Sequence, residues 1–224
     1  MEFTLLWAVL TAAVFAWGGL HIWDDRVPSD AGDRLLVASL LALVAGRITA
    51  MLVSGVNPLT HPADMIILRA GVDTAAASLV FIVSLAWTTR HLTGALDALA
   101  PAVLAGLAGW HSGCLWRGAC LGSPSELPWA WSQDGSLVTR HPVEIYAAVA
   151  LIVAAWMVGR LGWRAYLRAG VAVALAAAIR WVTEPLRPSL GGGPWGWYLA
   201  GIVLGALIVA VGPLLPDPAE TTPT

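Results

Sequence analysis

The sequence predicts an all-α protein that crosses a membrane about seven times. Of its 224 residues 58% are hydrophobic and 12% charged, and its mean hydropathy is +0.74. A water-soluble domain carries roughly twice that share of charge. A helix needs ~20 apolar residues to cross the ~30 Å hydrocarbon core. Seven stretches are predicted to do so, at residues 3–22, 35–54, 69–88, 92–110, 142–160, 166–184 and 195–215.

The connectors between these stretches are rich in Pro, Gly, Asp and Arg, as expected of loops. We find neither a solenoid-like repeat nor an interdomain linker. The sequence therefore predicts one transmembrane domain over residues 1–215, with an outer polar loop at about 111–141 and a cytoplasmic tail at 216–224. The N-terminus has an acidic residue, Glu2, instead of a basic region and lacks a small-residue cleavage pattern, so we expect a retained span and no cleaved signal peptide.

The charged residues argue against several functional classes. The net charge is −2 and all twelve basic residues are arginine, without a basic tail. This pattern predicts no nucleic-acid partner. Cys114 and Cys120 lack the spacing of a metal site, and we expect neither a metal nor a cofactor. Three roles stay open for these cysteines: small buried residues, a disulfide on an oxidising side of the membrane, or a nucleophile.

The distribution of arginine predicts the orientation. The connector between the fifth and sixth stretches contains Arg160, Arg164 and Arg168 and no acid, which favours the cytoplasmic side. Alternation over seven spans then places the N-terminus outside and the C-terminus inside. In this orientation the polar residues of five spans lie at one level, near the outer surface. They are Arg47, Arg69, Asp73, His111, His141, Glu144, Tyr146, Arg180, Glu184 and Arg187.

Arginine within a span is costly in lipid unless it is paired or hydrated. Arg47 and Arg180 are therefore candidates either for structural ion pairs and snorkelling or for binding a lipid phosphate. Glu184 follows Arg180 by four residues, so the two side chains share a helix face and can pair.

The other candidate side chains have similar alternatives. His141 is either a hydrated loop histidine or a base with a near-neutral pKa. Tyr146 is either an interfacial aromatic residue or a hydroxyl directed at a site, and the thirteen tryptophans show that interfacial aromatic residues are abundant here. His111 is either an interfacial histidine or part of the site.

Four segments, in order, resemble the prolipoprotein diacylglyceryl transferase family. One segment has Gly46 and Arg47 followed by His61 and Pro62. Another has the pattern Arg140, His141, Pro142 and Tyr146. A third is similar to the glycine-rich signature of that family, and the last to its Arg-x-x-x-Glu-x-x-Arg pattern. The signature segment contributes Gly113, Gly118, Gly122, Pro124, Leu127, Pro128 and Trp129. The last segment contributes Arg180, Glu184 and Arg187.

Other positions depart from the family pattern. His111 stands where the signature has its phosphate-binding arginine, and Arg117 stands in place of an asparagine. The signature's other asparagine and its glutamate fall on Cys114 and Ala119. A His-Gly-Gly motif with an essential histidine falls on Ala75, Ala76 and Ala77. The resemblance allows His111 and Arg117 to act as substitutes at the phosphate.

The resemblance implies a multi-pass enzyme of the bacterial inner membrane. Its reaction would transfer a diacylglyceryl group from phosphatidylglycerol to the lipobox cysteine in the signal peptide of a prelipoprotein. The expected catalytic residues are His141, Arg180, Glu184 and Tyr146, with His111 as a second candidate base. Substrate binding is expected at His111, Arg117, Arg187, Arg47 and Gly122. The alternatives are a relative with another lipid or acceptor, an inactive lipid-binding scaffold and, least favoured, a solute transporter.

Overall fold

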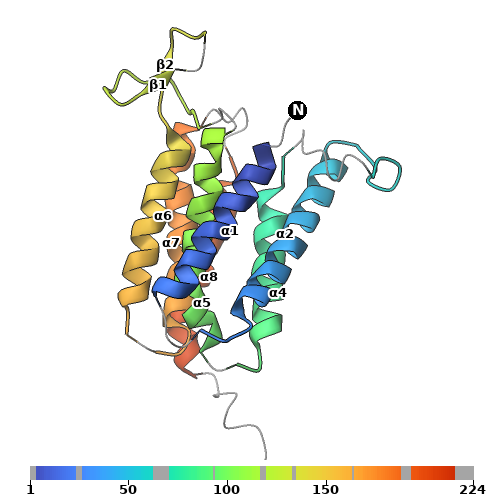
Figure 1. Ribbon diagram of the computed structural model, residues 1–224, viewed down its shortest axis with the longest axis vertical. Helices are drawn as coiled ribbons and strands as arrows, with labels where there is room; N and C mark the ends of the chain where they lie inside the picture. Colours follow the sequence, from blue (N-terminus) through green and yellow to red (C-terminus); the bar gives the residue numbers. More distant parts are fainter. Residues whose placement is uncertain are drawn as a thin grey trace, which may run out of the picture. The chain divides into compact units, whose positions relative to one another are not determined.

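The computed structural model describes residues 4–23, 27–62, 71–92, 94–116, 120–132, 135–162, 164–187 and 193–214. Most of these residues are helical (Figure 1). The chain divides into two compact units. Unit 1 comprises Met1–Val27 and Asp97–Leu215, and unit 2 is formed by Pro28–Leu96 together with Pro216–Thr224.

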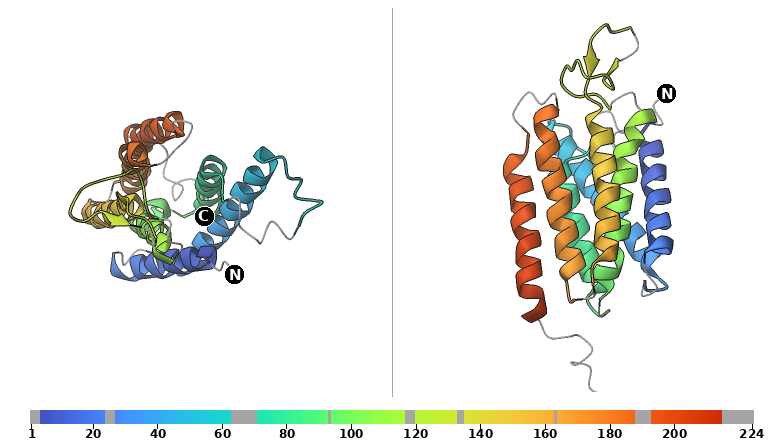
Figure 2. Two further views of the ribbon diagram at one scale, coloured as in Figure 1. Left: turned by 90° about the horizontal axis from the view of Figure 1, so that it is seen from above. Right: turned by 90° about the vertical axis from the view of Figure 1, so that its left-hand side faces the viewer.

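Unit 1 contains five α-helices that lie side by side in the order α8, α7, α6, α5, α1 (Figure 2, right). They are α1 (Thr4–Ile22), α5 (Ala95–Ser112), α6 (Val143–Arg160), α7 (Leu167–Thr183) and α8 (Trp195–Val211). Three short 3₁₀ segments extend them, η1 (Gly113–Trp116), η2 (Glu184–Leu186) and η3 (Gly212–Leu214). A two-stranded antiparallel hairpin, β1 (Trp131–Ser132) and β2 (Thr139–Arg140), lies beyond the first turn of α6.

Small side chains let the helices of unit 1 pack closely. The buried core joins α5, α6 and α7 through Ala100, Leu104, Ala105, Ala108, Leu151, Ala154, Ala155, Val158 and Ala172. Alanine brings helix axes near one another, which favours association in lipid, where there is no hydrophobic drive between helices. α1 is tied to α5 by the Thr11 hydroxyl, which donates to the Gly109 carbonyl at 2.8 Å.

Unit 2 contains α2 (Ala31–Val53) packed against α4 (Thr74–Thr89). α4 begins at Thr74 because the Asp73 carboxylate accepts the Ala76 amide at 2.8 Å and caps the helix. The sequence predicted a span from residue 69, and residues 63–70 lie outside the described part of the chain.

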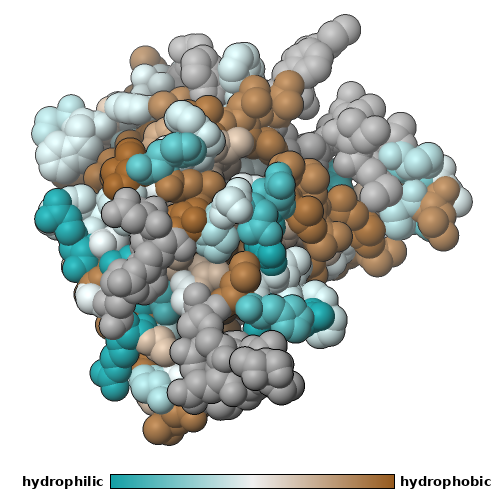
Figure 3. All heavy atoms as spheres, turned by 60° about the horizontal axis from the view of Figure 1, so that its bottom comes forward, coloured by the Kyte–Doolittle hydropathy of each residue, from teal (hydrophilic) through white to brown (hydrophobic). Residues whose placement is uncertain are grey.

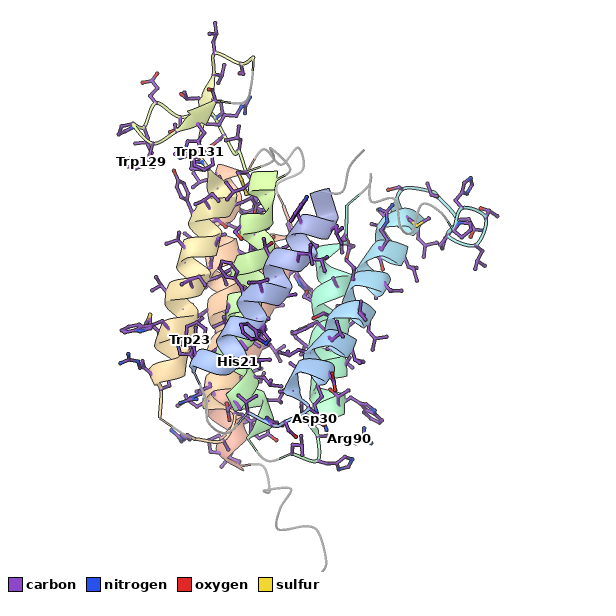
Figure 4. All side chains as sticks on the ribbon, in the orientation of Figure 1. His21, Trp23, Asp30, Arg90, Trp129 and Trp131 are labelled. Carbon is purple, nitrogen blue, oxygen red and sulfur yellow. A yellow bond between two sulfur atoms is a disulfide. The ribbon has the colours of Figure 1, made fainter. Side chains whose placement is uncertain are left out.

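Among the described residues, five helical segments are long and apolar enough to cross a membrane: Ala31–Val53, Ala95–Leu115, Val143–Arg160, Leu167–Leu186 and Trp195–Leu214. α1 and α4 are apolar but shorter. Large hydrophobic side chains are exposed along the helices, and in a view with the end opposite the hairpin forward they alternate with scattered hydrophilic residues (Figure 3). Within unit 1, Trp129 and Trp131 lie at the hairpin end and Trp23 at the opposite end (Figure 4). This pattern is typical of a multi-pass membrane protein with aromatic residues at both interfaces.

Candidate active site

Glu144, in the first turn of α6, is the centre of a polar cluster at the hairpin end of unit 1. Its Oε2 lies 2.6 Å from Nδ1 of His111, at the end of α5. Its Oε1 accepts a hydrogen bond from Nη2 of Arg187, and Nη1 of Arg180 lies 3.8 Å from Oε2. A carboxylate with an imidazole and two guanidinium groups around it is thus held between α5, α6 and the end of α7.

A second carboxylate, Glu184, lies on the other side of the two arginines. The Tyr198 hydroxyl of α8 donates to Oε2 of Glu184 at 3.2 Å and accepts from Nη2 of Arg180 at 3.4 Å. The direct distance between Nη2 of Arg180 and Oε2 of Glu184 is 4.0 Å. The predicted pairing of Arg180 with Glu184 is therefore present, but Tyr198 makes the closer connection.

The local sequence explains how Glu184 and Arg187 reach this position. α7 ends at Thr183, and Pro185 cannot continue the α-helical hydrogen bonds, so the chain tightens into the 3₁₀ turn η2. Gly193, at φ +66°, approaches the Glu184 carboxylate so closely that a Cβ would lie 2.1 Å from Oε1. Only glycine combines this backbone conformation with that space. Glu184 is accordingly buried.

Both arginines retain hydrogen-bonding capacity. Nη1 of Arg180 and Nε of Arg187 are buried without a hydrogen-bond partner among the described residues. A buried N–H without a partner is costly, more so on a charged group. Burial lowers the pKa of the Arg187 guanidinium, and the neighbouring Glu144 carboxylate opposes this shift without cancelling it. The guanidinium stays cationic in either case. The arrangement offers two cations with spare donors to an anion such as a phosphate.

His141 and Tyr146 form a separate contact beneath the hairpin. Nε1 of Trp129 donates to the Tyr146 hydroxyl at 2.9 Å, and Nδ1 of His141 lies 3.5 Å from the same hydroxyl. In the described part of the chain, no hydrogen bond joins His141 to the Glu144 cluster. Because Tyr146 accepts from Trp129, its own O–H remains able to donate elsewhere.

Gly122 attaches the loop that precedes α6 to the site. Its amide donates to the His141 carbonyl at 2.7 Å, and its carbonyl accepts from Nη1 of Arg140 at 3.1 Å. A Cβ here would lie 2.1 Å from the Leu186 carbonyl oxygen, so the loop packs directly on η2. Near the start of the same loop a disulfide joins Cys114 to Cys120, which settles the question that the sequence left open for these cysteines.

The structure thus brings together four of the predicted site residues, His111, Arg180, Glu184 and Arg187. Arg47 lies in unit 2, where it is buried and its Nη1 donates to the Gly71 carbonyl just before α4. Arg117 lies outside the described residues. The described residues contain no group of three or more His, Cys, Asp or Glu side chains placed to hold a metal ion.

Sequence reasoning missed the central place of Glu144 and the bridge made by Tyr198. The signal for Glu144 was available, since it is an acid in the first turn of an apolar span and such residues are costly in lipid. Tyr198 gave no such signal, because it lies in an aromatic-rich helix start where interfacial residues are common.

The helices and the cluster define a class: a multi-pass membrane protein whose buried arginines, histidine and carboxylates can hold an anionic group at one end of the helices. Comparison with known proteins makes this specific. The model of the prolipoprotein diacylglyceryl transferase family matches residues 3–215, and the chain belongs to that family.

Curated relatives carry the name phosphatidylglycerol–prolipoprotein diacylglyceryl transferase. The protein from Cupriavidus metallidurans is 27% identical over 225 residues, which cover 88% of this chain and 83% of the relative. Those from Nitratidesulfovibrio vulgaris and Pseudomonas aeruginosa are each 31% identical, over 131 and 125 residues. These two matches cover 55% and 52% of this chain but 49% and 47% of the relatives, so they span about half of those proteins.

Proposed function

We propose that this protein transfers the diacylglyceryl group of phosphatidylglycerol to the lipobox cysteine of prelipoproteins. The observation that carries the proposal is the pair Arg180 and Arg187, whose unused N–H groups lie beside a histidine in a chain of this family. The reaction requires a group that binds the departing phosphate and a base that takes the thiol proton. Both kinds of group are present at one end of unit 1.

The chemistry can be written with the residues of the cluster. The cysteine thiol loses its proton to a histidine, and the sulfur lone pair attacks the glyceryl CH₂ carbon next to the phosphate. The C–O bond breaks, its electron pair stays on the phosphate oxygen, and glycerol phosphate leaves. Arg180 and Arg187 bind the phosphate more strongly as its charge grows, which lowers the barrier. Glu184, through Tyr198, orients Arg180.

The other predicted residues have parts in the same proposal. His141 and His111 are the two candidate bases, and the Tyr146 hydroxyl donates a hydrogen bond to the substrate. Arg117, Arg47 and Gly122 are proposed to contribute to substrate binding. No cofactor enters this scheme, because the displacement needs only a base and a phosphate-binding group.

We place the cluster at the outer surface of the bacterial inner membrane. The proposed topology has seven spans in one transmembrane domain over residues 1–215, with the N-terminus outside and the tail at 216–224 in the cytoplasm. The Cys114–Cys120 disulfide supports this orientation, because disulfides persist on the oxidising side of that membrane. The outer polar loop at about 111–141 then meets signal peptides as they emerge.

A transfer assay tests the function. Purified protein in nanodiscs receives phosphatidylglycerol labelled in its acyl chains and a lipobox peptide, beside a peptide in which serine replaces the cysteine. We expect label on the cysteine peptide alone, with glycerol phosphate released in equal amount. Folded protein that binds the lipid without transfer would contradict the proposal. It would favour an altered acceptor or a scaffold, in line with Ala75–Ala77 in place of the family's His-Gly-Gly.

A further inference from the structure

Glu144 holds two different groups with its two oxygens. Oε2 lies 2.6 Å from Nδ1 of His111, and Oε1 accepts from Nη2 of Arg187. A carboxylate only accepts hydrogen bonds, so Nδ1 of His111 carries the hydrogen, and in the neutral imidazole Nε2 is left with a lone pair. In the described part of the chain, Nε2 makes no hydrogen bond. This tautomer is the one that a base requires.

We infer that Glu144 is a positioning residue that makes His111 the base of the reaction. The inference rests on the proposed function and selects between the two histidines that the function leaves open. Among the residues that the structure describes, no carboxylate lies at Nδ1 of His141, which is 3.5 Å from the Tyr146 hydroxyl, the outer limit of a hydrogen bond. His111 is fixed at 2.6 Å by a carboxylate that is itself largely buried.

The shared carboxylate also fixes the distance between the base and the phosphate-binding group. Because one side chain binds both His111 and Arg187, the base cannot move away from the guanidinium. Displacement at the glyceryl carbon needs the sulfur on one side and the phosphate oxygen on the other, and such fixed geometry lowers the barrier of the reaction.

The surrounding charges are compatible with this role. The groups that face His111 and Glu144 are Arg180 and Glu184 at the end of α7, Arg187 after η2 and Tyr198 of α8. Within the described part of the cluster, the two arginines balance the two carboxylates while His111 is neutral. When Nε2 takes the thiol proton, Glu144 pairs with the imidazolium. The proton then passes to the departing glycerol phosphate, and His111 returns to its neutral form.

The test is a comparison of Glu144→Gln, Glu144→Asp, His111→Gln and the double variant Glu144→Gln/His111→Gln in the nanodisc assay. Removal of a general base costs about 10²–10⁴-fold in kcat, and removal of the partner that orients it about 10–100-fold. We expect His111→Gln and Glu144→Gln to lose kcat within these ranges at pH 7. The double variant should be no worse than His111→Gln alone, because the amide oxygen of the glutamine can still accept from Arg187 and the rest of the effect of Glu144 passes through His111.

Alkaline pH gives a readout that a merely structural role would not move. An ordinary cysteine thiol has a pKa of about 8.5, so at pH 9.5 most of the peptide is already thiolate and needs no base. The losses of both single variants should therefore shrink by roughly tenfold or more between pH 7 and pH 9.5. Glu144→Asp, which keeps the carboxylate, should recover part of the rate at pH 7.

Matched controls make the same chemical changes elsewhere. Glu126→Gln alters an exposed loop carboxylate and His21→Gln an exposed histidine at the opposite end of α1, and both should transfer like the wild type. Thermal unfolding monitors the fold of each variant. Where Glu144→Gln lowers the folded yield, His111→Gln and Glu144→Asp decide the matter.

The outcomes distinguish a failure of the inference about Glu144 and His111 from a failure of the proposed function. Wild-type kcat in His111→Gln, losses that multiply in the double variant, or losses equal at pH 7 and pH 9.5 would overturn the inference while the proposed function stands. A wild-type protein that transfers nothing would overturn the proposed function and the inference with it.

Discussion

The two ends of unit 1 both bury charged side chains, but they use them differently. At the end opposite the hairpin, Asp97 of α5 accepts from the Tyr166 amide at 2.7 Å and the Ala169 amide at 2.9 Å. Arg168 donates from Nε and Nη2 to the Leu161 carbonyl, at 3.0 and 2.7 Å. At the hairpin end, Nη1 of Arg180 and Nε of Arg187 have no hydrogen-bond partner among the described residues. A buried charge alone therefore does not mark a site, and within unit 1 it is the unused hydrogen-bonding capacity that distinguishes the hairpin end.

The opposite end shows what a buried charge does for a fold. α7 begins after Tyr166, which adopts φ +60° and offers no side-chain cap. The first amides of a helix have no partner within it. Asp97 supplies the cap from another helix, and Arg168 closes the carbonyl end of α6. The α6–α7 connector is thus held by charges that serve structure.

The largest effect is expected from Arg180→Ala. Loss of a group that stabilises the charge of the leaving phosphate costs about 10²–10³-fold in transfer rate. The free energy of unfolding should change little, because the substitution removes a buried N–H without a partner together with the charge. The matched control is Arg160→Ala, an exposed arginine at the opposite end that lies over Trp156. Full transfer by Arg180→Ala would mean that the cluster is not the site.

Asp97→Ala should show the opposite pattern. It leaves the amides of Tyr166 and Ala169 buried without an acceptor, at a cost of about 2–4 kcal/mol in the free energy of unfolding. Denaturant titration in detergent measures this loss. Transfer per folded molecule should stay at the wild-type level. A lowered transfer rate with unchanged stability would extend the site to this end and contradict the difference proposed between the two ends.

Gly122→Ala tests the attachment of the loop that precedes α6. A Cβ 2.1 Å from the Leu186 carbonyl must displace η2 or the loop, so we expect a loss of about 1–3 kcal/mol in the free energy of unfolding. Gly32→Ala is the control, since a Cβ at that helical position meets nothing within 4 Å. Equal stability of the two variants would show that the loop does not pack on η2.

Tyr146→Phe should have the smallest effect. It removes the hydroxyl that accepts from Trp129 and is proposed to donate to the substrate, and one neutral hydrogen bond to the substrate is worth about 1 kcal/mol, or roughly a fivefold change in rate. Initial rates of transfer measure it. A loss of a hundredfold or more would place the hydroxyl in the chemistry itself.

The sequence predicted the class of fold and much of the cluster. Apolar stretches with polar residues at one level indicated that His111, Arg180, Glu184 and Arg187 lie at one depth, and in unit 1 they lie together. Depth follows from position along a span, but direction around the helix axis does not. For that reason the sequence did not reveal that Glu144 is the common partner.

Other features depended on contacts between distant segments. From the sequence, Arg168 was used only to predict the cytoplasmic side. In the structure it is 5% exposed and its side chain donates to backbone carbonyls. Whether Cys114 and Cys120 meet depends on the path of the loop between them, which composition does not determine. The space that Gly193 leaves for Glu184 likewise arises only when η2 folds back toward α8.

One pair of isosteric variants tests the contrast most directly. Glu144→Gln and Asp97→Asn make the same change, a buried carboxylate into an amide, at the two ends of unit 1. Transfer rate and free energy of unfolding are measured for both. We predict that Glu144→Gln loses transfer and keeps its stability, whereas Asp97→Asn loses stability and keeps transfer per folded molecule. Equal transfer by the two variants, or the reverse pattern, would contradict the assignment of the Glu144 cluster as the active site.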